Sequence, residues 1–313
     1  MTLDRQEIEN ILFMGHLKCL FLGIGRQDTI DLSSSLKVVQ NFRRNQGAIS
    51  SGIDFRSLRS LRVLGLDLSP GMAIGPAGTL DSLEELILKG PAKLITEFLG
   101  TILVPQLASV RLFVADSPRS ERLLKIFSFL GHHALKIIAV CALGTYEKIY
   151  TINWNQIFAH LSGLAELEAL RLQFYQVSIS MDDHDMARLA QTWQSLKILD
   201  LRHCETSTSR LPSMKSLVQV AENAPKLREL YLDIQNNIDS LLPLECAVFN
   251  HQLQILDLYF HWKDPKSEIG SMANFFHSLF PCLDTRGLVG DDQRWTEMLR
   301  LIDEKRGSRQ LEK

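Results

Sequence analysis

The sequence predicts an α/β fold, an open solenoid in which one short parallel strand and one helix alternate, with the strands on the concave side of a horseshoe and the helices on its convex side. Leucine is in excess, at 52 of the 313 residues. A Leu-x-x-Leu-x-Leu pattern recurs along the chain, and segments with helical periodicity separate its copies. One strand–helix unit buries little apolar surface by itself, so the units are expected to stack into one elongated domain.

The recurring pattern is typical of leucine-rich repeats. Seven strict copies and two relaxed copies, in which valine or isoleucine replaces leucine, lie along the chain. From Leu61 to Leu253 they cover 192 residues in seven steps, a mean of about 27, against about 20 to 29 for this repeat class. The second and third leucine positions of each copy are expected to point into the core from a parallel strand. The strict copies begin at Leu17, Leu61, Leu83, Leu167, Leu196, Leu227 and Leu253, and the relaxed copies at Leu107 and Leu135.

Five segments between the strands are expected to form helices on the convex side. Their apolar residues lie three and four positions apart, the spacing that places them on one helical face. Prolines lie at or near several of the borders, where a missing amide donor costs least. The segments are residues 91–103, 118–130, 182–193, 214–224 and 268–279.

The two ends of the chain differ from the central repeats. An irregular insert at about residues 26–56, predicted as either an enlarged connection or an extra outer helix, lengthens the first step. Residues 280–285 predict a final short strand, and residues 287–313 predict a capping helix and tail that cover the last core layer. The predicted domains are therefore the solenoid, 1–286, and the cap, 287–313. The apolar face expected for the cap consists of Trp295, Met298, Leu299 and Ile302.

Composition excludes several classes of partner. The 34 basic and 36 acidic residues nearly cancel, so no whole-chain field favours nucleic acid or an acidic membrane surface. The five cysteines are odd in number, widely spaced and never in a Cys-x-x-Cys pair, which indicates a reducing compartment. No apolar segment reaches the roughly 18 to 20 residues that a membrane span needs. We expect an intracellular protein, cytoplasmic or nuclear, with no nucleic-acid partner and no membrane partner.

The acidic run at residues 181–185 has a simpler explanation than a metal site. It holds three carboxylates and one histidine, which is suitable chemistry for a metal ion. Adjacent side chains at the start of a helix, however, point in different directions. Asp182 and Asp183 are therefore expected to cap the following helix.

No other residue pattern indicates an active site. His132 and His133 end a predicted helix, where positive charge is favoured, and Cys204 beside His203 occupies the asparagine or cysteine position of the repeat consensus. Neither a nucleophile elbow nor a helical zinc-protease motif occurs. The sequence predicts that the protein is not an enzyme, with no catalytic residue, no metal ligand and no cofactor.

The face opposite the helices is the candidate binding surface. Side chains alternate along a strand, so positions five and seven of each copy point to the concave side when positions four and six point into the core. Solvated strand faces carry polar residues in general, but here the last third of the chain combines carboxylates with tyrosines, which suits a basic peptide or protein segment. That acidic, aromatic patch consists of Asp200, Tyr231, Asp233, Asp257 and Tyr259. The full set of predicted partner-binding residues is Arg111, Phe113, Arg171, Asp200, Arg202, Tyr231, Asp233, Asp257 and Tyr259.

Four stretches resemble the leucine-rich C-terminal part of fungal F-box-like proteins, which are solenoids of the ribonuclease-inhibitor-like class. They are residues 58–66 (LRSLRVLGL), 224–232 (APKLRELYL), 253–258 (LQILDL) and 279–283 (LFPCL), the last followed by an acidic turn and Trp295. The resemblance spans most of residues 56–306, and its motifs are specific for the repeat class more than for any one member.

The resemblance implies a scaffold for protein–protein interaction that serves as the substrate-recognition part of an F-box-type ubiquitin ligase receptor. In that family an N-terminal F-box binds the Skp adaptor of a cullin-RING ligase, and the repeats hold the substrate. Residues 1–50 contain no Leu-Pro pair, with which an F-box is expected to open. A Skp-type adaptor is therefore expected as a partner only if an F-box precedes Met1. The alternative function is a repeat-only binding or structural protein without a ubiquitin-ligase link.

Overall fold

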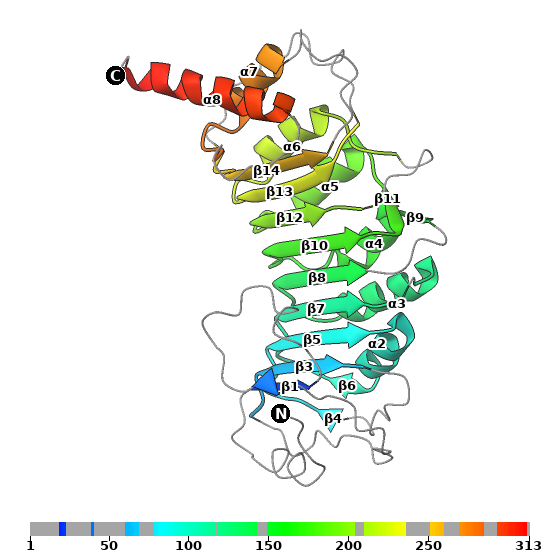
Figure 1. The fold of residues 1–313 in the computed structure, drawn as a ribbon. Helices are drawn as coiled ribbons and strands as arrows, with labels where there is room; N and C mark the ends of the chain where they lie inside the picture. The colour runs from blue at the N-terminus through cyan, green and yellow to red at the C-terminus, as the bar shows by residue number, and fades with distance from the viewer. Residues whose placement is uncertain are drawn as a thin grey trace. The chain divides into compact units, whose positions relative to one another are not determined.

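A computed structural model shows an α/β protein with large parallel sheets and helices (Figure 1). The chain packs as two compact units, one of Met1–Tyr150 with Phe174–Gln176 and the other of Thr151–Gln173 with Val177–Lys313. Among the described strands, neither unit's sheet closes into a barrel. The structure describes residues 19–22, 39–40, 60–68, 78–116, 118–142, 149–203, 210–235, 251–259, 269–284 and 293–311.

The sheet of the first unit is parallel and pairs equivalent motif positions. Leu64 lies beside Leu86, Leu86 beside Val110, and Val110 beside Ile138. These residues are fully buried, and along the central strands buried and half-exposed side chains alternate. The described strands run in the order β8 (Ile137–Ala142), β7 (Ser109–Val114), β5 (Glu85–Gly90), β3 (Val63–Asp67), β1 (Cys19–Leu22) and β2 (Val39–Gln40).

The sheet of the second unit repeats this arrangement. Leu199 lies beside Leu230, and Leu230 lies beside Leu256, each fully buried. Its described strands run in the order β14 (Ile255–Tyr259), β13 (Glu229–Asp233), β12 (Ile198–Leu201) and β10 (Ala169–Phe174). Two short two-stranded sheets are separate from the main sheets: β4 (Gly78–Thr79) with β6 (Ile102–Leu103), which pair in parallel, and β9 (Tyr150–Asn153) with β11 (Val177–Ser180).

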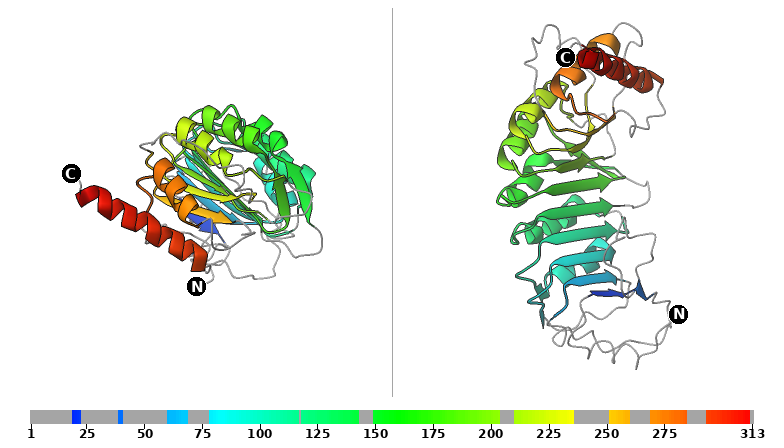
Figure 2. Two further views of the ribbon diagram at one scale, coloured as in Figure 1. Left: turned by 90° about the horizontal axis from the view of Figure 1, so that it is seen from above. Right: turned by 90° about the vertical axis from the view of Figure 1, so that its left-hand side faces the viewer.

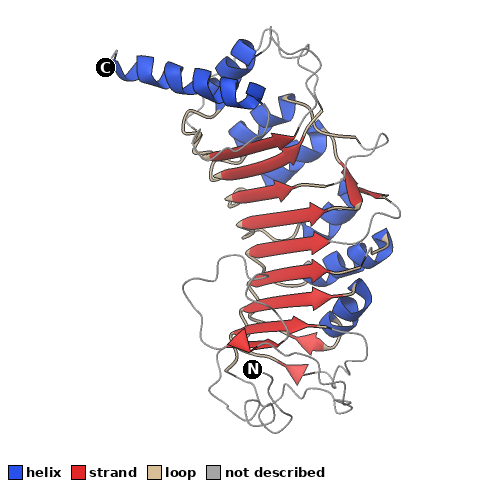
Figure 3. Ribbon diagram, viewed as in Figure 1, coloured by secondary structure: helices blue, strands red, loops and turns tan. Residues whose placement is uncertain are grey.

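Helices cover one face of the sheet in each unit (Figures 2 and 3). The first unit contains α2 (Ala92–Leu99) and α3 (Ser120–Leu130), and the second contains α4 (Trp154–Leu161), α5 (Asp183–Thr192), α6 (Lys215–Asn223), α7 (Ile269–Leu279) and α8 (Gln293–Leu311). Helices α2 and α3 pack together on their sheet, as do α4, α5 and α6 on theirs. Helix α7 packs against α6, and α8 packs against α7.

The observed elements follow most of the positions that the sequence predicts. All nine motif copies hold a strand, and each of the five predicted convex segments contains a helix. The sequence does not predict helix α4, whose signal is an Asn-x-x-Gln capping box. The Asn153 side chain accepts a hydrogen bond from the Asn155 amide (2.8 Å), and the Gln156 side chain accepts one from the Asn153 amide (3.3 Å).

Two predicted elements are wrong in detail. Helix α2 ends at Leu99, not at residue 103, because the chain turns at Gly100 and residues 102–103 pair with β4 instead. Residues 280–284 form a turn and not a strand. The Leu283 amide donates to the Phe280 carbonyl oxygen (3.2 Å), and the Asp284 amide donates to the Gln254 carbonyl oxygen (2.6 Å). The turn before β13 has the same two bonds, so residues 280–284 correspond to the turn that precedes a strand.

The C-terminal helix has the predicted apolar face. In α8 Met298, Leu299 and Ile302 are buried, whereas the side chain of Trp295 lies outside the described residues. The insert at 26–56, apart from β2, and the boundary at 286–287 also lie outside them. The domain limits 1–286 and 287–313 therefore stay predictions.

No helix in the described part of the chain combines the length and the apolar character needed to cross a bilayer.

Gly90 permits a close approach between the ends of β3 and β5. Its φ of 150° belongs to a region of backbone conformation that favours glycine. The Leu68 amide donates to the Lys89 carbonyl oxygen (2.6 Å), and a Cβ at position 90 would lie 2.5 Å from the Leu68 carbonyl oxygen. No side chain fits there without movement of the backbone.

We expect Gly90→Ala to lower the free energy of unfolding by about 2 to 4 kcal/mol, because the backbone must either strain or leave its pairing position. Gly163→Ala is the matched control, since nothing lies within 4 Å of a Cβ there. The control should change stability by less than about 1 kcal/mol. Urea denaturation followed by circular dichroism measures both, and equal effects would contradict the steric argument.

His251 links two successive turns of the second unit in its neutral form. Its Nδ1 accepts a hydrogen bond from the Leu253 amide (3.0 Å), so Nε2 carries the proton and donates to the Ala224 carbonyl oxygen (2.8 Å). The ring packs edge-on against Phe280. Burial lowers the pKa of His251 below its ordinary value of 6.5, although the bond to Ala224 opposes this shift.

Stability should therefore fall in mild acid, because the unfolded chain protonates His251 more readily than the folded chain does. The contribution of the neutral ring is complete above about pH 6.5 and is lost as the pH falls toward the lower folded-state pKa. We expect His251→Gln to flatten the pH dependence of the unfolding free energy, measured in urea between pH 7.5 and 5.5. His133, whose pKa is also lowered by burial, is present in both proteins as a common background. An unchanged slope in the variant would show that another group is responsible.

Candidate functional site

The candidate site lies on the strand face of the second unit that points away from the leucine core. Because the strands pair in register, side chains from successive motif copies form rows across this face. In the central row Arg171 lies beside Asp200, Asp200 beside Tyr231, and Tyr231 beside Asp257. These four residues together with Arg202 are called the β10–β14 face below.

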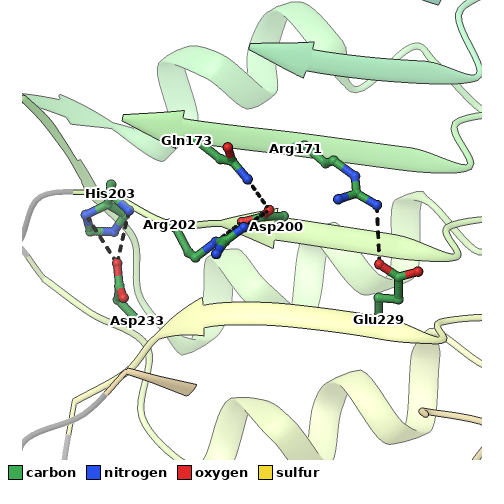
Figure 4. Close-up of polar contacts among 7 residues, drawn as sticks. All are labelled: Arg171, Gln173, Asp200, Arg202, His203, Glu229 and Asp233. Carbon is green, nitrogen blue, oxygen red and sulfur yellow. Dashed lines mark hydrogen bonds and ion pairs between the residues drawn. The ribbon is translucent and has the colours of Figure 1, made fainter. Parts of the chain in front are cut away.

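Asp200 is the centre of a hydrogen-bond network on this face. Its carboxylate is fully buried, at 0% exposure, and accepts from Nε and Nη2 of Arg202 at 2.9 and 2.8 Å (Figure 4). Nε2 of Gln173 donates to the same carboxylate at 2.7 Å. The hydrogen bond from Arg202 to Asp200 is the main reason that the pKa of the guanidinium is raised above its ordinary value. A buried carboxylate needs such partners, so Asp200 orients Arg202 and does not face solvent.

Arg202 and Tyr231 form the central exposed part of the face. The guanidinium carbon of Arg202 lies 4.8 Å from the centre of the Tyr231 ring, in a cation–π contact that leaves the arginine side chain 47% exposed. Partial burial, followed by the charge of Glu229, raises the pKa of the Tyr231 hydroxyl. Glu229 itself pairs with Arg171 at 3.3 Å (Figure 4). The ring therefore lies between two ion pairs that hold its surroundings in place.

Asp257 carries the uncompensated charge of the face. It is an exposed residue next to Tyr231, and it forms no hydrogen bond or ion pair with any residue that the structure describes. Partial burial is the largest cause of a pKa raised above the ordinary 3.8; the charge of Arg202 lowers it and that of Asp200 raises it. A partly desolvated carboxylate without a partner favours an incoming cation.

Asp233 has a structural contact instead of a free carboxylate. It is 5% exposed, and its Oδ2 accepts from the His203 backbone amide at 3.1 Å and lies 3.8 Å from Nδ1 of the His203 ring (Figure 4). This contact ties the end of β12 to β13. Tyr259 lies in register with Asp233 on β14, but its side chain is outside the described residues.

Arg111 and Phe113 belong to the first unit. Nε of Arg111 lies 3.3 Å from Oε1 of Glu85 on the neighbouring strand, and Phe113 is half-buried on the same strand as Arg111. Arg111 and Phe113 therefore belong to a different unit from the residues of the β10–β14 face.

The expected acidic, aromatic patch needs a correction at two positions. Asp200 and Asp233 are buried and already paired, so neither presents its carboxylate to a partner. Asp257 is the member of the patch whose carboxylate is exposed in the described part of the chain. Gln173 and Glu229 were not among the predicted residues, although strand alternation at positions seven and three of their copies places them on the same face.

The helix-capping prediction is confirmed for Asp182. Its Oδ1 accepts from the Asp185 amide (3.0 Å), and the Asp185 side chain accepts from the Asp182 amide (3.3 Å). Asp183 has a different role: its two oxygens accept from the amide and the hydroxyl of Ser213 at 2.6 and 2.7 Å, which tethers α5 to the segment before α6.

The remaining candidate residues are His132, His133 and Cys204. His132 and His133 follow the end of α3, and Cys204 lies outside the described residues. Within the described ranges, no group of three or more histidine, cysteine or acidic residues could hold a metal ion.

Comparison with known proteins does not show a family for this chain, so its function is inferred from the site. No protein-family model matches the chain, and no curated protein matches its sequence.

We expect Arg202→Ala to lower the free energy of unfolding by about 3 kcal/mol, because the buried Asp200 would keep only its Gln173 donor. Adding Asp200→Asn to that variant should recover a large part of the loss. Arg62→Ala is the comparison: Arg62 pairs with Glu84 where about half of each side chain is exposed, and its loss should cost less than about 1 kcal/mol. Chemical denaturation that gave similar losses for Arg202→Ala and Arg62→Ala would argue against the buried pair.

Proposed function

We propose that the chain is a leucine-rich-repeat solenoid whose β10–β14 face binds a partner protein. Support for the repeat class comes from the equivalent pairing of motif positions, with Leu199, Leu230 and Leu256 in adjacent strands at the same height. From β5 to β13, one helix lies in the chain between each strand of the main sheets and the next, which supports the same assignment.

The observation that carries the binding role is the fixed arrangement around Arg202 and Tyr231. Asp200 orients the guanidinium, and the guanidinium lies over the tyrosine ring. Side chains that are ordered before binding lose little conformational entropy when a partner arrives. Tyrosine and arginine are also the residue types that contribute most to binding energy at protein interfaces.

The role in the cell follows from the family resemblance. The proposed role is the substrate-recognition part of an F-box-type ubiquitin ligase receptor in the cytoplasm or nucleus, with a Skp-type adaptor as a partner only if an F-box precedes Met1. A repeat-only binding or structural protein is the alternative. We propose a non-enzymatic role in either case, since Asp200, Glu229 and Arg202 are engaged with side chains of the chain itself.

We expect Tyr231→Ala combined with Asp257→Ala to abolish partner capture and to lower Tm by less than about 4 °C, because neither side chain belongs to the leucine core. Proteins retained by the wild type and not by the variant are identified by mass spectrometry. One of them is then purified and titrated by calorimetry.

Gln219→Ala combined with Glu222→Ala changes the α6 surface on the other side of the sheet and should leave the titrated affinity unaltered. Equal affinity for the wild type and the Tyr231/Asp257 variant would reject the proposed surface. Among the retained proteins, a Skp-type adaptor and a cullin would distinguish a ligase receptor from a repeat-only binder.

A further inference from the structure

The charges of the β10–β14 face cancel in pairs except at one position. Arg202 is compensated by the buried Asp200, and Arg171 by Glu229. Asp257 is left without an ion-pair partner among the described residues, and it is exposed. An incoming group therefore meets one unpaired charge on this face, and that charge is negative.

We propose that Asp257 and the Tyr231 ring form an acceptor site for a lysine or arginine side chain of the partner protein, an inference that rests on the binding role proposed above. The cationic group would pair with the Asp257 carboxylate and contact the adjacent tyrosine. Register pairing holds the two residues side by side on β14 and β13.

An acidic side chain is a poor occupant of the same position. Arg202, the nearest cation of the face, already forms two hydrogen bonds with the Asp200 carboxylate. An acidic group would also stand close to the unpaired Asp257 and be repelled by it. The raised pKa of Asp257, caused first by partial burial, is consistent with a carboxylate that gains from a cation.

The experiment tests whether binding requires a basic side chain. The probe is a display library of random peptides about twelve residues long. Peptides are selected on the wild-type protein in low salt and then counter-selected on Asp257→Asn, which keeps the shape of the side chain and removes its charge. We expect the selected peptides to share a lysine or arginine. Replacing that residue by methionine, or replacing Asp257 by asparagine, should each weaken binding by at least about thirtyfold.

Charge reversal gives a second readout. Asp257→Lys should select acidic peptides in place of basic ones, while Glu222→Gln, which removes one negative charge from the exposed surface of α6, should leave the wild-type selection unchanged. A circular dichroism spectrum equal to that of the wild type verifies that each variant is folded.

The outcomes separate the cation site from the wider proposal. Peptides that lack a basic residue but lose binding in Tyr231→Ala would overturn the cation site and leave the binding face intact. A selection in which no peptide depends on Arg171, Tyr231 or Asp257 would overturn both. Binding to Asp257→Asn within threefold of the wild type would overturn the role of the carboxylate.

Discussion

The pairing of each strand with the next at the same motif position is the constraint on which the remaining structure depends. Leu199 and Leu230 lie side by side with no exposed surface, so a shift of one residue would turn them outward and bring charged neighbours into the core. Burial of the leucines therefore sets the register. The register in turn places Asp200 beside Tyr231 on the opposite side of the same strands. An apolar requirement on one side of the sheet thus determines which polar groups meet on the other.

The sequence predicts the strands well because the same leucine positions must be buried in every copy of the motif. Nine copies with this one requirement leave few other positions at which the strands could lie. Features outside the strands are harder to predict. Helix α4 begins at a capping box at Asn153, in a stretch between motif copies where the leucine spacing gives no signal. Residues 280–284 form the same kind of turn that precedes β13, so the apolar residues there indicate a turn and not the strand itself.

The candidate site could be predicted only in part, for a related reason. Alternation along a strand identifies the side to which Asp200 and Asp257 point, but not how deeply each carboxylate is covered. Their difference arises from neighbours: Arg202 turns back over Asp200, and Gln173 reaches it from the preceding strand. Such contacts depend on side-chain rotamers and on which residue occupies the adjacent strand. Two aspartates that look equivalent in the motif therefore have opposite roles, one as an internal anchor and the other as an exposed charge.

The network around Asp200 also restricts how this stretch of chain can change over evolutionary time. In the repeat architecture proposed above, each strand–helix repeat mainly contacts its immediate neighbours, so whole repeats can be gained or lost by duplication and deletion. Here the anchor carboxylate, its amide donor and the ring beneath the guanidinium come from three successive strands: Asp200 from β12, Gln173 from β10 and Tyr231 from β13. An insertion between β10 and β12 would remove the Gln173 donor from the buried Asp200, and an insertion between β12 and β13 would remove the ring next to the Arg202 guanidinium. The repeats that contain β10, β12 and β13 are therefore expected to be inherited together, as a block, even if repeats elsewhere in the chain are gained or lost.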